Sequence, residues 1–135
     1  MFVDACAIVA IISNEAEADE YALALTSAAD AFTSVLAAWE AALVLSRNDK
    51  LNLNVEVTGK IVQAWLKQNN IEMRNCTAPA AEVYARALHA AATYGVSRRA
   101  LSNFDCFQYA YAILEDVPML TLDRLLRTTN LRTRP

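Results

Sequence analysis

Glycine and proline are scarce in this chain, which has two glycines and three prolines in 135 residues. An all-β fold with many tight turns needs more of both, so the composition favours helices joined by short loops. Two glycines also leave no glycine-rich loop to hold a nucleotide phosphate, which excludes a P-loop and a dinucleotide-binding fingerprint. The apolar fraction of 56% is large enough to bury a core, and we expect a single domain over residues 1–135.

Basic residues are missing from the first third of the chain. No Lys or Arg precedes Arg47, whereas seven acidic residues do. Arginines collect instead in the last third, at Arg98, Arg99, Arg124, Arg127, Arg132 and Arg134. This asymmetry fits a basic rim that attracts a phosphate-bearing ligand, and equally fits arginines on solvated faces and near helix C-termini.

Zinc motifs and long apolar runs are also missing. The three cysteines, Cys6, Cys76 and Cys106, are far apart and form no Cys-x-x-Cys pair, so we expect free thiols and a cytoplasmic protein. The apolar run at 5–12 is too short to span a bilayer. Asp4 and the lack of a basic segment before that run argue against a signal peptide, and no membrane contact is expected.

Strand and helix patterns alternate along the chain. Helical patterns cover 5–12, 15–26, 35–45, 55–68, 77–94, 104–114 and 124–128, and strand patterns cover 1–3, 31–33, 71–74, 117–122 and 131–133. This alternation predicts an α/β fold with a mainly parallel sheet covered by helices on both faces. The helix at 35–45 is apolar nearly all round and is expected to be buried. In the helix at 55–68, Val57, Ile61, Ala64 and Trp65 share one face.

Four acidic residues stand in apolar surroundings: Asp4, Glu40, Asp105 and Asp123. A carboxylate in such a setting costs several kcal/mol unless it is paired or binds a metal. Asp4 and Asp123 follow predicted strands, and the carboxyl ends of parallel strands form the edge where ligands bind in such sheets. Carboxylates that meet there without a basic partner would repel one another, and a hard cation such as Mg²⁺ or Mn²⁺ removes that repulsion. The pattern therefore predicts a metal site used for phosphodiester hydrolysis.

Each acid also has a purely structural explanation. Asp4, Asp105 and Asp123 stand where helix N-caps are expected, whereas Glu40, in the middle of a helix, has the weakest such explanation. His89, alone on an alanine-rich helix, is expected to be a surface or packing residue. The large aromatic residues, Trp39 and Trp65 among them, are expected in the core or an interface and not on a base-stacking surface.

Four segments resemble the motifs of a known family. Val3-Asp4-Ala5-Cys6-Ala7-Ile8-Val9 resembles the opening of PIN-domain ribonucleases, in particular the VapC-type toxins of bacterial toxin–antitoxin pairs. The residues 38–45 around Glu40 are similar to that family's glutamate helix. The stretch from Tyr94-Gly95 to Asp105-Cys106-Phe107-Gln108-Tyr109-Ala110 resembles its most specific signature, and Leu120-Thr121-Leu122-Asp123 resembles its last acidic motif.

The resemblance implies a PIN-like three-layer fold with a parallel sheet of about five strands. It implies an endoribonuclease dependent on Mg²⁺ or Mn²⁺ whose metal ligands and catalytic residues are Asp4, Glu40, Asp105 and Asp123. Its implied partners are an RNA substrate, a cognate antitoxin protein that inhibits it, and a second copy in a homodimer.

The chain departs from the family pattern in three ways. Cys6 replaces the usual Ser or Thr. Ser102 and Phe104 replace the usual Asn and Gly before the third acid, and no extra Asp follows Asp123. These departures favour an alternative, a catalytically weak or inactive PIN-like module that binds a protein partner. A phosphotransfer domain is a third possibility, disfavoured because no second acid accompanies Asp4 and no lysine follows a late strand.

Overall fold

The computed structural model describes residues 1–95 and 100–135. Within these residues one parallel sheet has the strand order β3-β2-β1-β4-β5, which confirms the predicted α/β fold. Its strands are β1 (Phe2–Val3), β2 (Phe32–Thr33), β3 (Glu72–Met73), β4 (Met119–Leu120) and β5 (Thr133–Arg134). Chain order reverses between β1 and β4. The carboxyl ends of β1, β2 and β4 therefore open onto one edge at the topological switch point.

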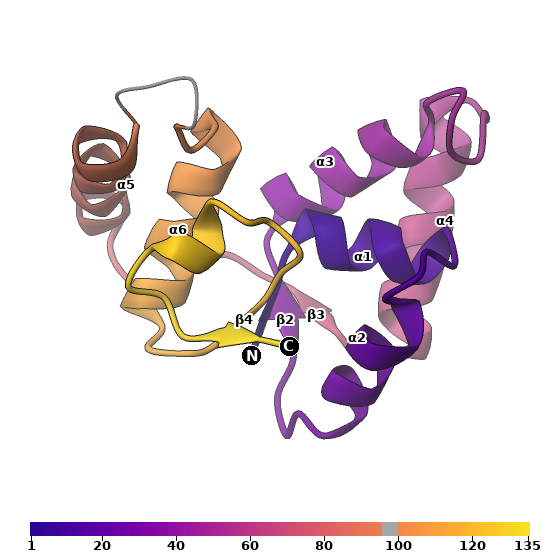
Figure 1. The fold of residues 1–135 in the computed structure, drawn as a ribbon, viewed down its shortest axis with the longest axis horizontal. Helices are drawn as coiled ribbons and strands as arrows, with labels where there is room; N and C mark the ends of the chain where they lie inside the picture. Colours follow the sequence, from indigo (N-terminus) through magenta and orange to yellow (C-terminus); the bar gives the residue numbers. More distant parts are fainter. Residues whose placement is uncertain (96–99) are drawn as a thin grey trace.

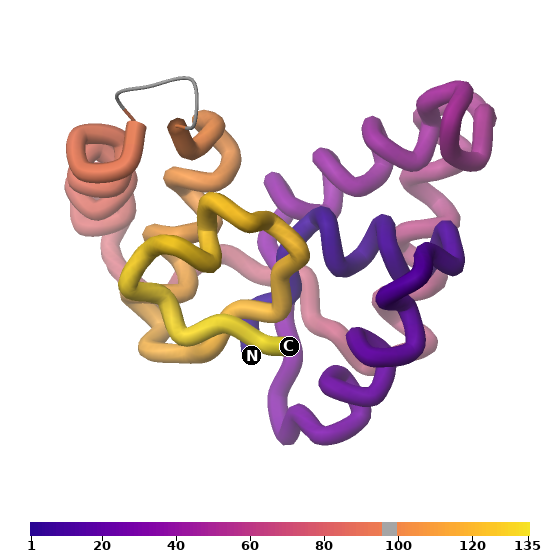
Figure 2. The backbone as a smooth tube through the Cα atoms, viewed as in Figure 1, coloured from indigo at the N-terminus to yellow at the C-terminus, as the bar shows by residue number. Residues whose placement is uncertain are grey.

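The helices form two groups, one on each side of the sheet (Figure 1). One group contains α1 (Ala5–Ile12), α2 (Ala18–Thr26), α3 (Val35–Leu45) and α4 (Val55–Gln68), and the other contains α5 (Ala80–Tyr94) and α6 (Asn103–Leu114). The tube in Figure 2 shows the last segment of the chain, with the 3₁₀ helix η1 (Leu126–Thr128), returning beside the first strand. None of the described helices combines the length and the apolar character that crossing a bilayer requires.

Two helices begin later than the sequence predicts. We predicted the second helix from residue 15, but α2 begins at Ala18, because Ser13 ends α1 and Asn14 turns the chain with a positive φ of 53°. We predicted the fifth from Thr77, but α5 begins at Ala80, directly after Pro79. Thr77 does not cap it because its N–H and hydroxyl both donate to Glu115. The short helix predicted at 124–128 is the 3₁₀ turn η1.

The buried face of α4 differs from the predicted one. The structure buries Thr58, Val62 and Leu66, whereas Val57 is 44% exposed. The Thr58 hydroxyl donates to the carbonyl of Ala42 on α3 at 2.9 Å. This buried hydrogen bond between the helices accompanies a rotation of α4 that turns the predicted face partly outward.

Helix α3 is buried on one face only, which corrects the expectation that it is buried all round. Its alanines pack inward, with Ala37 and Ala41 fully buried. The small side chains let the helix approach its neighbours closely. Of the larger ones, Leu45 is fully buried at the end of the helix, whereas Val35 is 57% exposed and Trp39 is 49% exposed. Trp39 is therefore not a core residue.

Candidate metal centre

Asp4 lies at the carboxyl end of β1 and is almost completely buried, with 3% of its surface exposed. It is the N-cap of α1, because its Oδ1 accepts the N–H of Ala5 at 2.6 Å. Its Oδ2 accepts hydrogen bonds from the Cys6 thiol at 2.8 Å and the Thr121 hydroxyl at 2.5 Å. The capping role expected as an alternative is thus present, but it uses only one of the two oxygens.

Thr121 connects Asp4 to Asp123. Its hydroxyl donates to Asp4 and accepts the N–H of Asp123 at 3.0 Å. Asp123 in turn accepts the N–H groups of Leu125 and Leu126 through Oδ1, at 2.7 and 2.9 Å. These bonds fix the loop after β4 against the loop after β1 and leave the second carboxylate oxygen of Asp123 outside this network.

Glu40 comes from the middle of α3 and meets α6 through one hydrogen bond. Its Oε2 accepts the Nε2–H of Gln108 at 2.7 Å. Gln108 is 1% exposed, and its own Oε1 is buried with no hydrogen-bond partner among the described residues. A buried amide oxygen without a hydrogen-bond partner lowers the free energy of unfolding. This oxygen therefore suits a hydrogen-bond donor or a cation beside it.

Asp105 stands in the first turn of α6. It forms a capping box with Ser102: Asp105 Oδ2 accepts the Ser102 N–H at 2.7 Å, and the Ser102 hydroxyl accepts the Asp105 N–H at 3.1 Å. Ser102, one of the departures from the family pattern, therefore caps the helix directly. The box fixes the Asp105 side chain at the start of the helix.

Three of the four carboxyl groups have raised pKa values. Burial raises the pKa of Asp4 to about 6; hydrogen bonds from Cys6 and Thr121 oppose this, and the charge of Asp105 adds to it. Burial also raises the pKa of Glu40 to about 7, and the charges of Asp4, Asp105 and Asp123 raise it further against the Gln108 hydrogen bond. The pKa of Asp105 is raised by burial and by Asp123. Charges coupled in this way lie near one another.

The donor set fits a hard divalent cation in chemical type. All four side chains offer oxygen, which Mg²⁺ and Mn²⁺ prefer, and none of the four joins an ion pair among the described residues. Over residues 1–95 and 100–135, however, no group of three or more His, Cys, Asp or Glu side chains is close enough to hold an ion directly. Mg²⁺ commonly keeps several waters and uses only one or two carboxylates.

Comparison with known proteins identifies the family. The chain matches the PIN domain over residues 1–130. It belongs to the PIN-domain family. The structure of this PIN domain is similar to the crystal structure of Mycobacterium tuberculosis VapC20, described as a sarcin-ricin loop cleaving toxin, with a TM-score of 0.72 and 15% sequence identity over 99% of this chain and 98% of that one. At this identity the likeness shows the fold. No curated protein matches the chain.

Two of the arginines expected on the rim of this PIN domain have other contacts. Arg127 donates to the carbonyls of Thr121 and Pro135 and to the Tyr21 hydroxyl, and Arg132 pairs with Asp116. Arg124 and Arg134 are exposed, whereas Arg98 and Arg99 lie outside the described residues. Of the described arginines, Arg124 directly follows one of the four acids, Asp123.

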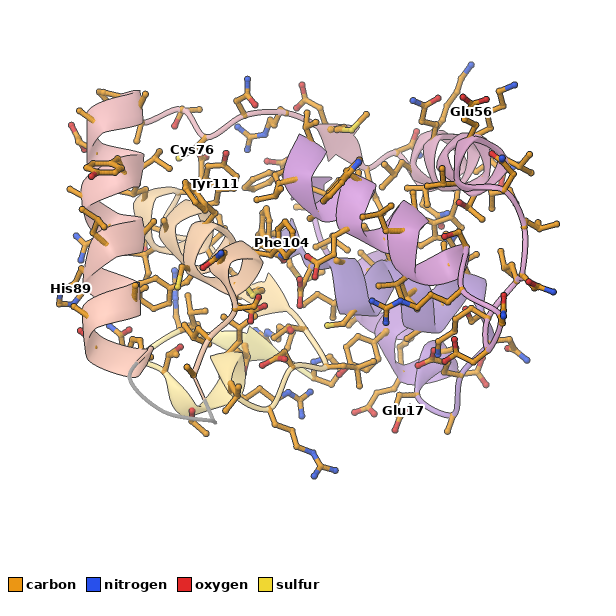
Figure 3. The ribbon with its side chains drawn as sticks, turned by 90° about the horizontal axis from the view of Figure 1, so that it is seen from above. Glu17, Glu56, Cys76, His89, Phe104 and Tyr111 are labelled. Carbon is orange, nitrogen blue, oxygen red and sulfur yellow. The ribbon has the colours of Figure 1, made fainter. Side chains whose placement is uncertain are left out.

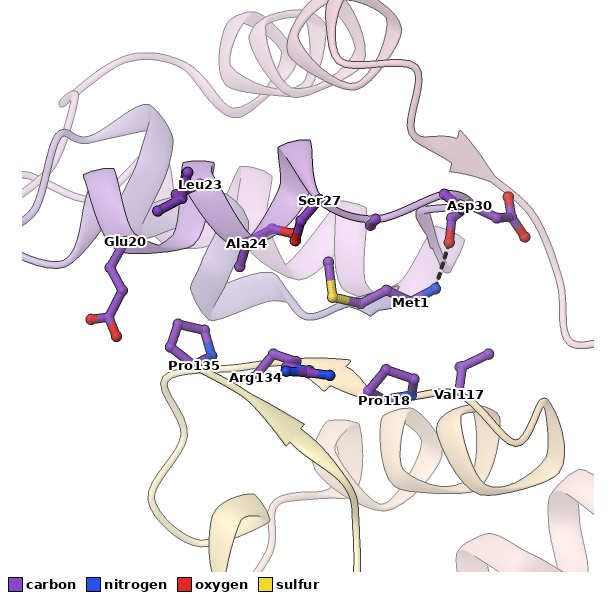
Figure 4. Close-up of a pocket in the computed structure, with 12 residues that line it drawn as sticks. Met1, Glu20, Leu23, Ala24, Ser27, Asp30, Val117, Pro118, Arg134 and Pro135 are labelled. Atoms are coloured by element: carbon purple, nitrogen blue, oxygen red, sulfur yellow. Dashed lines mark hydrogen bonds between the residues drawn. The ribbon is translucent and has the colours of Figure 1, made fainter.

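A groove of about 670 Å³ lies elsewhere on the molecule. Residues that precede three strands, among them Met1, Asp30 and Pro118, line it together with Arg134 (Figure 4). None of the four acids contributes to it. The carboxylates and not this groove are the candidate site, because Asp4 and Glu40 have the raised pKa values that are typical of reactive centres.

Sequence reasoning missed two residues that shape the site. Thr121 holds Asp4 and Gln108 holds Glu40. Both gave a weak signal, a polar residue in an apolar stretch: Thr121 between two leucines before Asp123, and Gln108 one helical turn after Asp105. Asn130, near the position of the missing extra acid, accepts hydrogen bonds from Tyr94 and Tyr109 instead.

Proposed function

We propose that this PIN domain is an endoribonuclease toxin of the VapC type, which hydrolyses RNA phosphodiester bonds with the help of Mg²⁺ or Mn²⁺. The observation that carries the proposal is a set of coupled carboxylates, at the carboxyl edge of the sheet of a PIN-family chain, that has no ion-pair partner within residues 1–95 and 100–135. Such a set is unfavourable until a cation joins it. The fold likeness to a toxin that cleaves the sarcin-ricin loop supports RNA as the substrate class.

In this proposal Asp4, Glu40, Asp105 and Asp123 hold the cation. A bound Mg²⁺ or Mn²⁺ supplies an activated water and neutralises charge on the phosphate. The chain supplies the positioning: Thr121 and Cys6 orient Asp4, and Gln108 orients Glu40. Capping bonds fix Asp105 and Asp123. Supporting hydrogen bonds of this kind tune cation affinity by roughly 10- to 100-fold.

The proposed partners follow from the same assignment. A cognate antitoxin that inserts a basic side chain among the carboxylates would satisfy them as a cation does. Exposed apolar residues before and at the start of α4, Leu53, Val55 and Val57, offer a surface for a second copy in a homodimer. The three free cysteines fit a cytoplasmic location.

Cleavage of RNA by the purified chain tests the proposal. We expect cleavage of a mixed RNA with Mg²⁺ or Mn²⁺, none with EDTA, and loss of cleavage in Asp4→Ala. Asp19→Ala, which removes an exposed acid on α2, is the matched control and should cleave normally. Equal cleavage by Asp4→Ala and the wild type would overturn the assignment of the site.

A catalytically weak or inactive module that binds a protein is the second candidate. One observation favours it: both oxygens of Asp4 already accept hydrogen bonds, one of them from Cys6, where the family has a hydroxyl. Restoring the family residue in Cys6→Ser separates the candidates. No cleavage by either form, together with no Mn²⁺ binding, would favour the binding module.

A further inference from the structure

Two aromatic rings meet beside the carboxylates. Trp39 on α3 and Phe104 on α6 lie with ring centroids 5.8 Å apart and planes tilted by 51°. Trp39 directly precedes Glu40, and Phe104 directly precedes Asp105. Seen from above, Phe104 lies at the side of α6 that faces α3 (Figure 3). The ring pair therefore joins the same two helices as the hydrogen bond between Gln108 and Glu40.

Core packing does not explain the position of Trp39. Helix α3 buries its alanine face, and Trp39 stays 49% exposed on the other side. An indole ring that remains half in water loses much of the free energy that its burial would provide. Phe104 adds a second, half-buried ring where the family usually has glycine. A large aromatic surface beside a polar site is typical of a place where a ligand binds.

We propose that Trp39 and Phe104 form a stacking subsite for one unpaired nucleobase of the RNA, next to the phosphate that the carboxylates and their cation bind. This inference rests on the proposed function and adds a feature of the substrate, an unpaired nucleotide at the cleavage position. The ring pair and the hydrogen bond between Gln108 and Glu40 belong to the same contact between α3 and α6. A nucleotide with its phosphate at Glu40 and Asp105 thus has its base beside this contact, where the rings lie.

The chemistry of the pair favours a base over other occupants. Aromatic rings bind the face of any base, so the subsite tolerates many sequences. A base within a duplex is already stacked on its neighbours, so the pair selects unpaired nucleotides. A second copy of the chain is the competing occupant, because Val35 is exposed one turn before Trp39. The adjoining carboxylates favour RNA in the presence of a cation, because the cation they hold in the proposed function attracts the phosphate next to the base, whereas a second copy would bring another set of acids to the same edge.

Fluorescence of Trp39 tests the proposal directly. The chain has two tryptophans, so Trp65→Phe leaves Trp39 as the only one. We expect 12-nucleotide oligo(A) and oligo(U), added with Ca²⁺ and checked for integrity on a gel, to quench this fluorescence, and their duplex to quench it far less. Anisotropy of labelled oligo(U) should show at least about a fivefold weaker Kd for Trp39→Ala and for Phe104→Ala. Trp39→Phe should keep most of the affinity. Tyr84→Ala, which removes an exposed ring on α5, should keep all of it.

Three results would overturn the proposal. The first is equal oligonucleotide affinity for Trp39→Ala and Tyr84→Ala. The second is no binding of either single strand by the wild type. The third is sedimentation showing that Trp39→Ala turns a dimer into a monomer with unchanged affinity per protomer, which would make the pair a contact between copies. Cleavage assays separate the two proposals: a chain that cleaves RNA with the same KM in Trp39→Ala keeps the proposed function and loses the subsite. A chain that binds oligonucleotides through Trp39 but does not cleave RNA keeps the subsite and loses the proposed function.

Discussion

Two acidic clusters in this molecule are built in opposite ways. In the first, Arg74 lies 3.5 to 3.9 Å from carboxylates of Asp30, Glu72 and Glu115 and stacks on Phe32. Burial acts to raise the pKa of Glu115, but hydrogen bonds from Thr77 and Cys76 and the charge of Arg74 leave it lowered. In the second, at the carboxyl edge, burial and like charges raise the pKa values of Asp4 and Glu40, and the described residues supply no ion pair.

The contrast separates acids that are paired with an arginine of the chain and stabilise the fold from acids that we propose bind a ligand. Glu115 and Asp4 are both buried, so burial alone does not distinguish them. The partner does: Arg74 completes the first cluster, whereas the described residues supply no ion pair to the carboxyl-edge acids, and in our proposal a cation from outside takes that place. Charge neutralisation should therefore have opposite effects on the two clusters.

The two acidic clusters should differ most in their effect on RNA cleavage. Glu40→Gln should lower RNA cleavage by about two orders of magnitude, the scale on which positioned charged groups contribute. The same change should raise the melting temperature of the cation-free protein at pH 8, because it removes like-charge repulsion. Glu72→Gln, in the Arg74 cluster, is the matched control and should leave cleavage unchanged. Cation-free Glu40→Gln that melts below the wild type would contradict the contrast.

Removing the basic partner should damage the fold. Arg74→Met leaves Glu115 buried without its cation and should lower the free energy of unfolding by about 2 kcal/mol, measured by urea denaturation. Arg132→Met removes an exposed ion pair, with Asp116, and should cost less than about 0.5 kcal/mol. If the two variants are equally stable, the Arg74 cluster does not have the structural role assigned to it.

The two clusters should also respond to pH in different windows. Asp4 and Glu40 bind protons more tightly in the folded than in the unfolded protein, so stability without cations falls as pH rises through about 6 and 7. The contribution of Asp4 is on the order of 3 kcal/mol. Glu115 has a lowered pKa, and its contribution is lost as pH falls below its ordinary value. Melting in EDTA should be highest near pH 5, and Mg²⁺ should restore stability at pH 8. A higher melting temperature at pH 8 than at pH 5 in EDTA would contradict this sign.

The smallest predicted effect concerns a residue that only positions another. Gln108→Leu keeps the side-chain volume and removes the hydrogen bond to Glu40. Mn²⁺ affinity, measured by electron paramagnetic resonance, should fall about tenfold. Stability should change little, because the variant also removes the unpartnered Gln108 oxygen. Gln63→Leu, on the exposed side of α4, should bind Mn²⁺ normally, and equal affinities would show that Gln108 does not position Glu40.

Local signals explain how much of this fold was predictable. The bounds of α1, α3 and α4 were predicted as observed, because Asp4, Ser34 and Asn54 cap them with their own side chains. The start of α5 was not, because Thr77 bonds to Glu115, 38 residues away. The rotation of α4 likewise depends on a bond from Thr58 to another helix. Caps within a few residues can be read from sequence, whereas contacts between elements cannot.

The site residues divide in the same way, into those visible in the sequence and those whose roles depend on contacts between distant elements. The four acids stood out because each interrupts apolar sequence. The charges of Asp4, Asp105 and Asp123 act on Glu40, but no three of the described acids are close enough to hold an ion directly. Their assignment as metal ligands stays a prediction. Thr121 and Gln108 were not singled out, because their roles depend on bonds to residues 117 and 68 positions away. Trp39 was expected in the core or an interface. It does not lie in the core and is 49% exposed, because alanines supply most of the buried face of its helix.

The bond between Thr121 and Asp4 has a consequence for the order of synthesis. A ribosome makes Asp4 117 residues before Thr121, yet β1 pairs with β4 and the Thr121 hydroxyl donates to Asp4. A nascent chain that lacks β4 therefore has Asp4 without this hydrogen bond and does not yet contain Asp123. If the chain is an RNA-cleaving toxin, its full set of carboxylates forms only after the β4 segment has been made, which delays activity relative to the synthesis of β1.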